Sequence, residues 1–176
     1  MKITREWAMP NKHTFLIGPI ADLVRRYCGR GIGWADPFSG ENSPAEFTND
    51  IDPLKPTTAH LEAHDFALTL PVTLKGVLFD PPYSLEQMKR AYENVHRTFT
   101  QRDGQIAGKW VELKDILAPK VELGGIAISF GWHSNGFGFK RNFEIIEILL
   151  VAHGGGHNDT IVTVERKAGH QERLTL

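Results

Sequence analysis

The stretch KGVLFDPPYS, residues 75–84, is the feature of the sequence that most constrains the fold. Its consecutive apolar residues, 77–79, are typical of a strand that is buried on both faces. An acid, Asp80, and two prolines follow, and because proline cannot donate to a sheet ladder, the strand has to end there. The sequence therefore predicts a buried strand that delivers a carboxylate and a stiff turn to one edge of a sheet.

Helical and strand patterns alternate along the rest of the chain. Helices are predicted from apolar residues three and four positions apart, over residues 18–28, 85–96 and 109–125, the last closed near Pro119. Strands are predicted over residues 31–40, 45–53, 75–84, 125–132, 143–153 and 159–168, of which the last two form a hairpin. Segment 59–66 fits a short strand or a helix end and is taken as a weak strand, whereas 97–108 and the glycine-rich 133–142 are expected to be loops. This order predicts an α/β protein with a mostly parallel sheet that is covered on both faces.

The composition is that of one ordinary globular domain, and we expect residues 1–176 to form a single domain. The single cysteine, Cys28, excludes a disulfide within the chain and suits a reducing compartment. The N-terminal residues show no apolar run of signal-peptide type, and no stretch is long and apolar enough for a membrane span. We therefore expect a cytoplasmic protein that does not associate with membranes.

Four acids follow the predicted strands, at the edge where ligands bind in parallel sheets. They are Asp36, Asp50, Asp65 and Asp80. One acid at a strand end carries little information, but four at the same edge predict a site for a cationic or hydroxyl-rich ligand. The histidine pair His153 and His157 flanks a triglycine turn and is not joined by a carboxylate or cysteine set, so no metal site is predicted.

Several of these segments resemble the motifs of S-adenosylmethionine-dependent N6-adenine DNA methyltransferases. DPPYS resembles the DPPY catalytic motif, and DPFSG at 36–40 resembles the cofactor loop of that family. NDIDP at 49–53, HDF at 64–66 and TFLIGPI at 14–20 are similar to further cofactor elements and occur in the family's order. The resemblance covers roughly residues 7–167 and is greatest to small phage-type adenine-specific DNA methylases. Many members of the family carry a separate target-recognition domain, and we expect this chain to have none. It implies a Rossmann-like class I methyltransferase fold, with a mostly parallel seven-stranded sheet and a C-terminal antiparallel hairpin.

The resemblance also implies roles for individual residues. The catalytic residues would be Asp80, Pro81, Pro82 and Tyr83. The residues that bind S-adenosylmethionine would be Phe15, Ile17, Asp36, Pro37, Phe38, Gly40, Asp50, Ile51, Asp65, Phe66 and Asp80. In this chain Glu41 and Asn42 follow Gly40, where relatives often have a second glycine. The resemblance therefore does not predict the conformation of this loop.

The chemistry of amine methylation explains why a carboxylate and a stiff turn are needed. The lone pair of an exocyclic base amine is delocalised into the ring, so the amine is a poor nucleophile. Two acceptors that hydrogen-bond the amine hydrogens would draw the nitrogen toward tetrahedral geometry. The Asp80 carboxylate and the Pro81 carbonyl could be these acceptors, because proline fixes the backbone and needs no reorganisation during the reaction. Tyr83 would stack on the base.

The expected partner is DNA, although the net charge of −1 does not by itself indicate a nucleic-acid-binding protein. Contacts are expected from two loops, through Arg97, Arg102 and Lys109 and through Asn135, Lys140 and Arg141. The cations among residues 89–120 could equally form a solvated face. Two alternatives to DNA adenine methylation stay open, an RNA methyltransferase that acts on an exocyclic amine and an inactive nucleic-acid-binding module.

Overall fold

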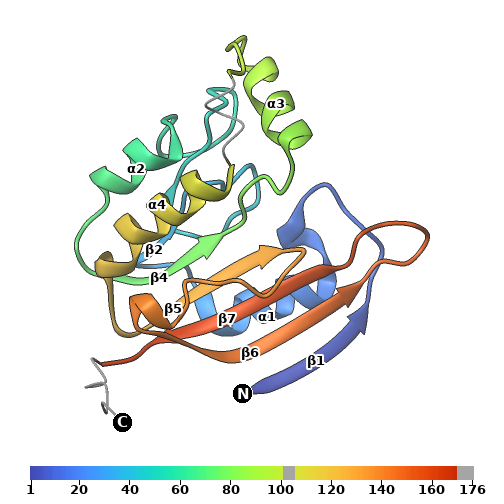
Figure 1. The fold of residues 1–176 in the computed structure, drawn as a ribbon, viewed down its shortest axis with the longest axis vertical. Coiled ribbons are helices and arrows are strands. Elements are labelled where there is room, and N and C mark those ends of the chain that lie inside the picture. Colours follow the sequence, from blue (N-terminus) through green and yellow to red (C-terminus); the bar gives the residue numbers. More distant parts are fainter. Residues whose placement is uncertain (101–105, 170–176) are drawn as a thin grey trace.

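A single sheet organises the computed structural model, which describes residues 1–100 and 106–169 (Figure 1). The seven strands lie in the order β1-β6-β7-β5-β4-β2-β3. Their bounds are Lys2–Trp7 for β1, Trp34–Asp36 for β2, Phe47–Thr48 for β3, Leu74–Phe79 for β4, Val121–Gly131 for β5, Phe143–Ala152 for β6 and Thr160–Lys167 for β7. Strand β7 runs antiparallel to its neighbours β5 and β6, and the other neighbouring pairs are parallel. The predicted Rossmann-like α/β fold, with its antiparallel C-terminal pair, is confirmed.

Helices cover both faces of the sheet. They are α1 at Gly18–Cys28, α2 at Ala63–Thr69, α3 at Leu85–Asn94 and α4 at Ile106–Lys120, with short 3-10 turns η1 at Thr14–Leu16 and η2 at Phe139–Arg141. Successive residues of a strand point to opposite faces, so Leu78 packs with α1 while Val77 and Phe79 pack with α2 and α4. Helix α3 lies apart from these layers, beyond the end of β4 (Figure 1).

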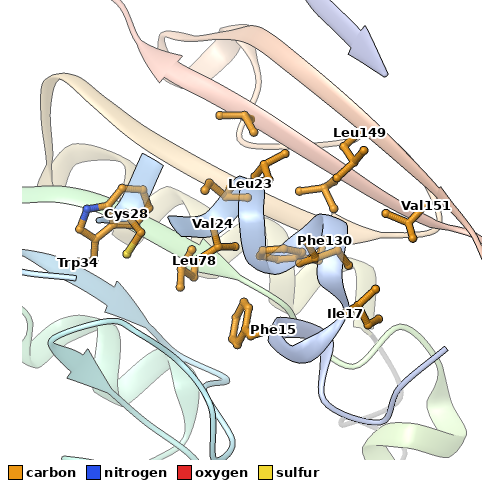
Figure 2. Packing of buried hydrophobic residues seen from close by; sticks show 14 residues of the cluster. Phe15, Ile17, Leu23, Val24, Cys28, Trp34, Leu78, Phe130, Leu149 and Val151 are labelled. Carbon is orange, nitrogen blue, oxygen red and sulfur yellow. The ribbon is translucent and has the colours of Figure 1, made fainter. Parts of the chain in front are cut away.

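Helix α1 is fixed by an apolar stripe along one side. Ile20, Leu23, Val24 and Cys28 recur at helical spacing and are all buried. Figure 2 shows the stripe packed against the strands, with Leu23 and Val24 facing side chains of the sheet. This cluster forms the hydrophobic core between α1 and one face of the sheet.

Strand β1 lies at the edge of the sheet and was not predicted from the sequence. Only Thr4 of its residues is even partly buried, so the strand lacks the alternation that would reveal it. A buried carboxylate on β6 holds it in place instead: Glu147 accepts hydrogen bonds from Arg26 and Tyr27 of α1 and forms an ion pair with Lys2 at 3.2 Å.

The expected strand over residues 59–66 is wrong. Ala59 alone forms a parallel bridge, to Asn49, and the chain then enters α2. Apolar residues Ala63, Phe66, Ala67 and Leu70 follow helical spacing, and packing against α4 decides in favour of the helix. The seventh strand of the sheet is therefore β1 and not this segment.

Other boundaries also differ from those expected, and the strand predicted over 31–40 is reduced to Trp34–Asp36. The strand predicted at 45–53 is reduced to Phe47–Thr48. Helix α4 begins at Ile106, inside the segment that was expected to be a loop. It ends at Lys120, before the predicted residue 125, and passes directly into β5 at Val121, with Pro119 inside the final helical turn.

Candidate active site

The turn after β4 places Asp80 at the carboxyl edge of the sheet. Asp80 is half-buried, and its carboxylate accepts hydrogen bonds from the Tyr83 hydroxyl and from the side chain of Thr14. The turn is anchored at its far end, where Ser84 accepts a hydrogen bond from the Gln87 amide at 3.2 Å and so caps α3. The Gln87 side chain in turn accepts from the Tyr83 amide at 2.7 Å. Asp80 therefore sits in a turn that is fixed at both ends.

A cleft of about 640 Å³ opens beside Asp80. The residues expected at a cofactor or catalytic site that line it are Pro37, Phe38, Asp50, Ile51, Asp65, Asp80 and Pro82. They come from loops that follow β2, β3 and β4 and from the first turn of α2. The fold thus brings together three of the four acids that the sequence placed at one edge.

The fourth acid, Asp36, lies beneath the cleft and is fully buried. It accepts hydrogen bonds from the Phe38 amide at 2.9 Å and from the Ser43 hydroxyl at 2.6 Å, and these bonds shape the loop after β2. Burial, which the two hydrogen bonds offset only in part, raises the pKa of Asp36 to about 7. Gly40 in the same loop has φ of 55°, and its amide donates to the Asp50 carboxylate.

Asn49 joins two walls of the cleft and was not expected from the sequence. Its side-chain oxygen accepts from the Leu61 amide at 2.9 Å, and its side-chain nitrogen donates to the carbonyls of Pro37 and Leu61 at 3.1 and 3.0 Å. These bonds use both the donor and the acceptor end of a buried amide to hold the loop after β2 beside the approach to α2. Its place in NDIDP, just before an acid at a strand end, was the available signal.

An aromatic group forms the apolar part of the cleft. The rings of Phe38 and Trp110 meet edge to face with centroids 5.0 Å apart, and Phe38 meets Phe79 in the same way at 5.6 Å, an arrangement that aromatic pairs favour. Trp110 and Leu113 come from α4 and Met88 from α3, so both helices line the cleft. The sequence predicts that these residues lie on helices. It does not show that the helices line a ligand-binding cleft.

The rim of the cleft is closed by a cluster around Glu62. This side chain forms an ion pair with Arg97 at 2.8 Å and accepts a hydrogen bond from the Tyr92 hydroxyl at 3.1 Å. The Lys109 ammonium lies 5.9 Å from the centroid of the Tyr92 ring and also lines the cleft. Two residues expected to contact DNA, Arg97 and Lys109, are thus part of the cleft wall and rim.

The loop at 133–142 is held by charged residues from three elements. Buried Glu165 accepts from the amides of Phe137 and Gly138 at 2.6 and 2.8 Å. Lys114 donates to the carbonyls of Asn135 and Gly136, and burial lowers the pKa of this lysine to about 8. Arg141 is bound to Asp115 at 2.7 Å. The second expected DNA-contacting loop is therefore anchored, and two of its expected contacts, Asn135 and Lys140, are exposed.

Other expected site residues lie outside the cleft lining. Phe15 and Ile17 are buried in the α1 cluster, where Phe15 meets Phe130 edge to face at 5.4 Å. Phe66 is buried in the cluster on the opposite face. Arg102 falls outside the described residues. Tyr83 is half-buried and faces Trp132, with ring centroids 5.7 Å apart.

The part of the chain that the structure describes contains no cluster of three or more metal-ligating side chains. Both ring nitrogens of His153 have protein partners at 2.9 Å, the carbonyl of Ala8 and the hydroxyl of Thr160. Over the same residues, no helix has the length and apolar character that a membrane span requires.

The fold has a solved counterpart in TrmN from Thermus thermophilus. The two structures superpose with a TM-score of 0.56 at 16% sequence identity, over 86% of this chain. The chain spans about half of the TrmN chain, since the match covers 49% of it. No family model and no curated protein sequence matches the chain. At this identity the likeness is one of fold alone, and that fold is a Rossmann-like α/β sheet.

Proposed function

We propose that this chain transfers a methyl group from S-adenosylmethionine to the exocyclic N6 amine of adenine in DNA. One observation carries the proposal: the Asp80 turn stands at a cleft that Asp50 and Asp65 line from neighbouring loops. The methyltransferase fold supports the reaction class, and the DPPYS sequence supports an amine as the acceptor.

The cleft suits S-adenosylmethionine in size and chemistry. Its volume of about 640 Å³ lies within the usual range for small-molecule sites. The carboxylates of Asp50 and Asp65 would accept hydrogen bonds from the ribose hydroxyls and from other donors of the cofactor, while Phe38 and Ile51 would pack on its apolar parts. When bound, the cofactor supplies a methyl group that is already activated on a sulfonium.

The residues after β4 would prepare the amine. The Asp80 carboxylate and the Pro81 carbonyl would accept its two hydrogens, which restores nucleophilic character to the nitrogen. The Tyr83 hydroxyl donates to the Asp80 carboxylate, so an incoming amine would take its place. Burial, partly offset by the hydrogen bond from Thr14, raises the pKa of Asp80 to about 6. This carboxylate is therefore mostly ionised at neutral pH and loses its charge as the pH falls through that value.

The same two acceptors would also fit an exocyclic amine in RNA, because they contact the base and not the sugar. An RNA amine methyltransferase is therefore the second candidate. A catalytically inactive nucleic-acid-binding module would bind cofactor or nucleic acid without transfer.

The experiment is methyl transfer from tritiated S-adenosylmethionine, with calorimetry of cofactor binding to the same preparation. Acceptors would be DNA and RNA oligonucleotides of one sequence, and matched oligonucleotides in which purine, which lacks the amine, replaces adenine. We expect cofactor binding and label incorporation into adenine-containing DNA alone. Preferential labelling of RNA would favour the RNA amine methyltransferase. Cofactor binding without labelling of any oligonucleotide would contradict the proposed methyl transfer.

A further inference from the structure

We propose that the substrate is an unpaired, single-stranded stretch of DNA, and that Trp132 is the stacking surface for the base next to the target. This inference rests on the proposed function and specifies the substrate of the same site. It is drawn from an exposed aromatic surface beside Asp80 and from the arrangement of the cations around the cleft.

The aromatic surface is built by the ends of two neighbouring strands. Tyr83 follows β4 and Trp132 follows β5, and their rings lie 5.7 Å apart with planes tilted by 48°. No base fits between two rings in such close contact. Trp132 is nevertheless 46% exposed, so it offers a second stacking face beside the one on Tyr83.

Two adjacent stacking faces suit two successive unpaired bases. Base–aromatic stacking tolerates any sequence, and single-strand-binding proteins use it along the strand. In a duplex the base next to the target stays stacked and paired, so it could not reach Trp132. The pair of surfaces is therefore of use mainly to a strand that is already open.

Apart from exposed Lys140, the described cations that were expected to contact DNA have partners within the protein, and the Lys109 ammonium lies 5.9 Å from the centroid of the Tyr92 ring. Arg97 is bound to Glu62 and Arg141 to Asp115. The ammonium of Lys114 is directed at loop carbonyls. A protein that extracts a base from a duplex has to offset the loss of pairing and stacking, and phosphate contacts by Lys and Arg supply most non-specific affinity. A substrate without a paired partner does not require this compensation.

The experiment measures binding by fluorescence anisotropy in the presence of S-adenosylhomocysteine. The probe is a labelled oligothymidylate that carries one central adenine, used as a single strand and as its duplex. We expect the unmodified chain to bind the single strand about tenfold more tightly or better, because no base has to be unpaired. Trp132→Ala should weaken binding of the single strand by about tenfold, the effect of losing one stacked base, while Trp132→Phe should lose less.

Trp7→Ala is the matched control, because Trp7 is also an exposed tryptophan and lies on β1, three strands away from β5. Its single-strand affinity should be unchanged. Equal affinity of the unmodified chain for duplex and single strand, or an unchanged affinity in Trp132→Ala, would overturn the inference. If duplex DNA were methylated at a rate that does not depend on Trp132, the inference would fail and the proposed function would stand. If no nucleic acid were methylated, both would fail.

Discussion

Buried carboxylates in the two halves of the sheet have opposite electrostatic environments. On β6, Glu147 is held by Arg26 at 2.9 and 3.0 Å, by the Tyr27 hydroxyl at 2.7 Å and by Lys2 at 3.2 Å. Burial alone would raise the pKa of Glu147, but these hydrogen bonds and charges lower it to about 2. At the cleft, Asp36 and Asp80 are held by hydroxyl and amide donors, and burial raises the pKa of these two groups to about 7 and about 6.

The difference separates a carboxylate with cationic partners from carboxylates that have only neutral hydrogen-bond donors. A buried charge that has cationic partners contributes to stability through them, and its removal affects the fold. A buried charge held only by neutral donors opposes folding, and groups of this kind with perturbed pKa values are concentrated at functional sites. The contrast gives three variants that should behave differently.

The largest effect is expected for Asp80→Ala. Loss of a charge-assisted acceptor should reduce single-turnover methyl transfer by about a hundredfold or more, because such bonds are about twice as strong as neutral ones. Thermal melting and cofactor affinity should stay close to those of the unmodified chain, since the partners of Asp80 are neutral hydroxyls. Asp80→Asn, which retains one acceptor oxygen, should keep more activity. Near-normal transfer by a folded Asp80→Ala protein would remove this carboxylate from the mechanism.

Glu147→Ala should behave in the opposite way, with a loss of stability and little effect on the chemistry. Its partners Arg26 and Lys2 are about half exposed, so water can solvate them once the carboxylate is gone. We therefore expect a loss of about 2 kcal/mol, which is less than the cost of breaking a fully buried ion pair. Urea unfolding measures this difference, with Glu6→Ala on exposed β1 as the control.

The effect of Glu147 should also depend on pH. The folded-state pKa is lowered from 4.5 to about 2. Its stabilisation is therefore complete above the unfolded-state pKa and is lost as the pH falls through the folded-state value. A stability difference between the unmodified and Glu147→Ala chains that persisted undiminished near pH 2 would contradict the assignment. This applies provided that both chains still unfold cooperatively there.

The effect of Asp36→Asn should appear only as a change with pH. The folded-state pKa of Asp36 is raised from 3.8 to about 7, so the unmodified chain loses stability as the pH rises from the lower of these values through the higher. Asparagine can accept from the Phe38 amide and donate to the Ser43 hydroxyl, and it carries no charge. The stability of the Asp36→Asn variant relative to the unmodified chain should therefore increase by about 2 kcal/mol between about pH 5 and about pH 8. Denaturant midpoints at the two pH values measure this change, and parallel curves would contradict it.

The sequence predicted the central part of the fold because burial on both faces leaves a continuous apolar run, as in residues 77–79. It predicted α1 and α3 for a similar reason, since a one-sided helix shows its period. It missed β1, whose residues are almost all exposed, and it mistook α2 for a strand because a seven-residue helix has too few turns to show a clear period. Whether an edge strand or a short helix forms depends on its contacts with neighbouring elements.

The same distinction applies to the site. The sequence by itself determined that an acid and two prolines end a buried strand, and which acids follow the neighbouring strands. Only the tertiary structure decided that Asp50, Asp65 and Asp80 share one cleft while Asp36 is buried beneath it, and that residues such as Asn49 complete the walls. The physical reason is range: strand burial and turn stiffness depend on adjacent residues, whereas the partners, exposure and pKa of a side chain depend on segments brought together by the packing of α2 and α4 on the sheet.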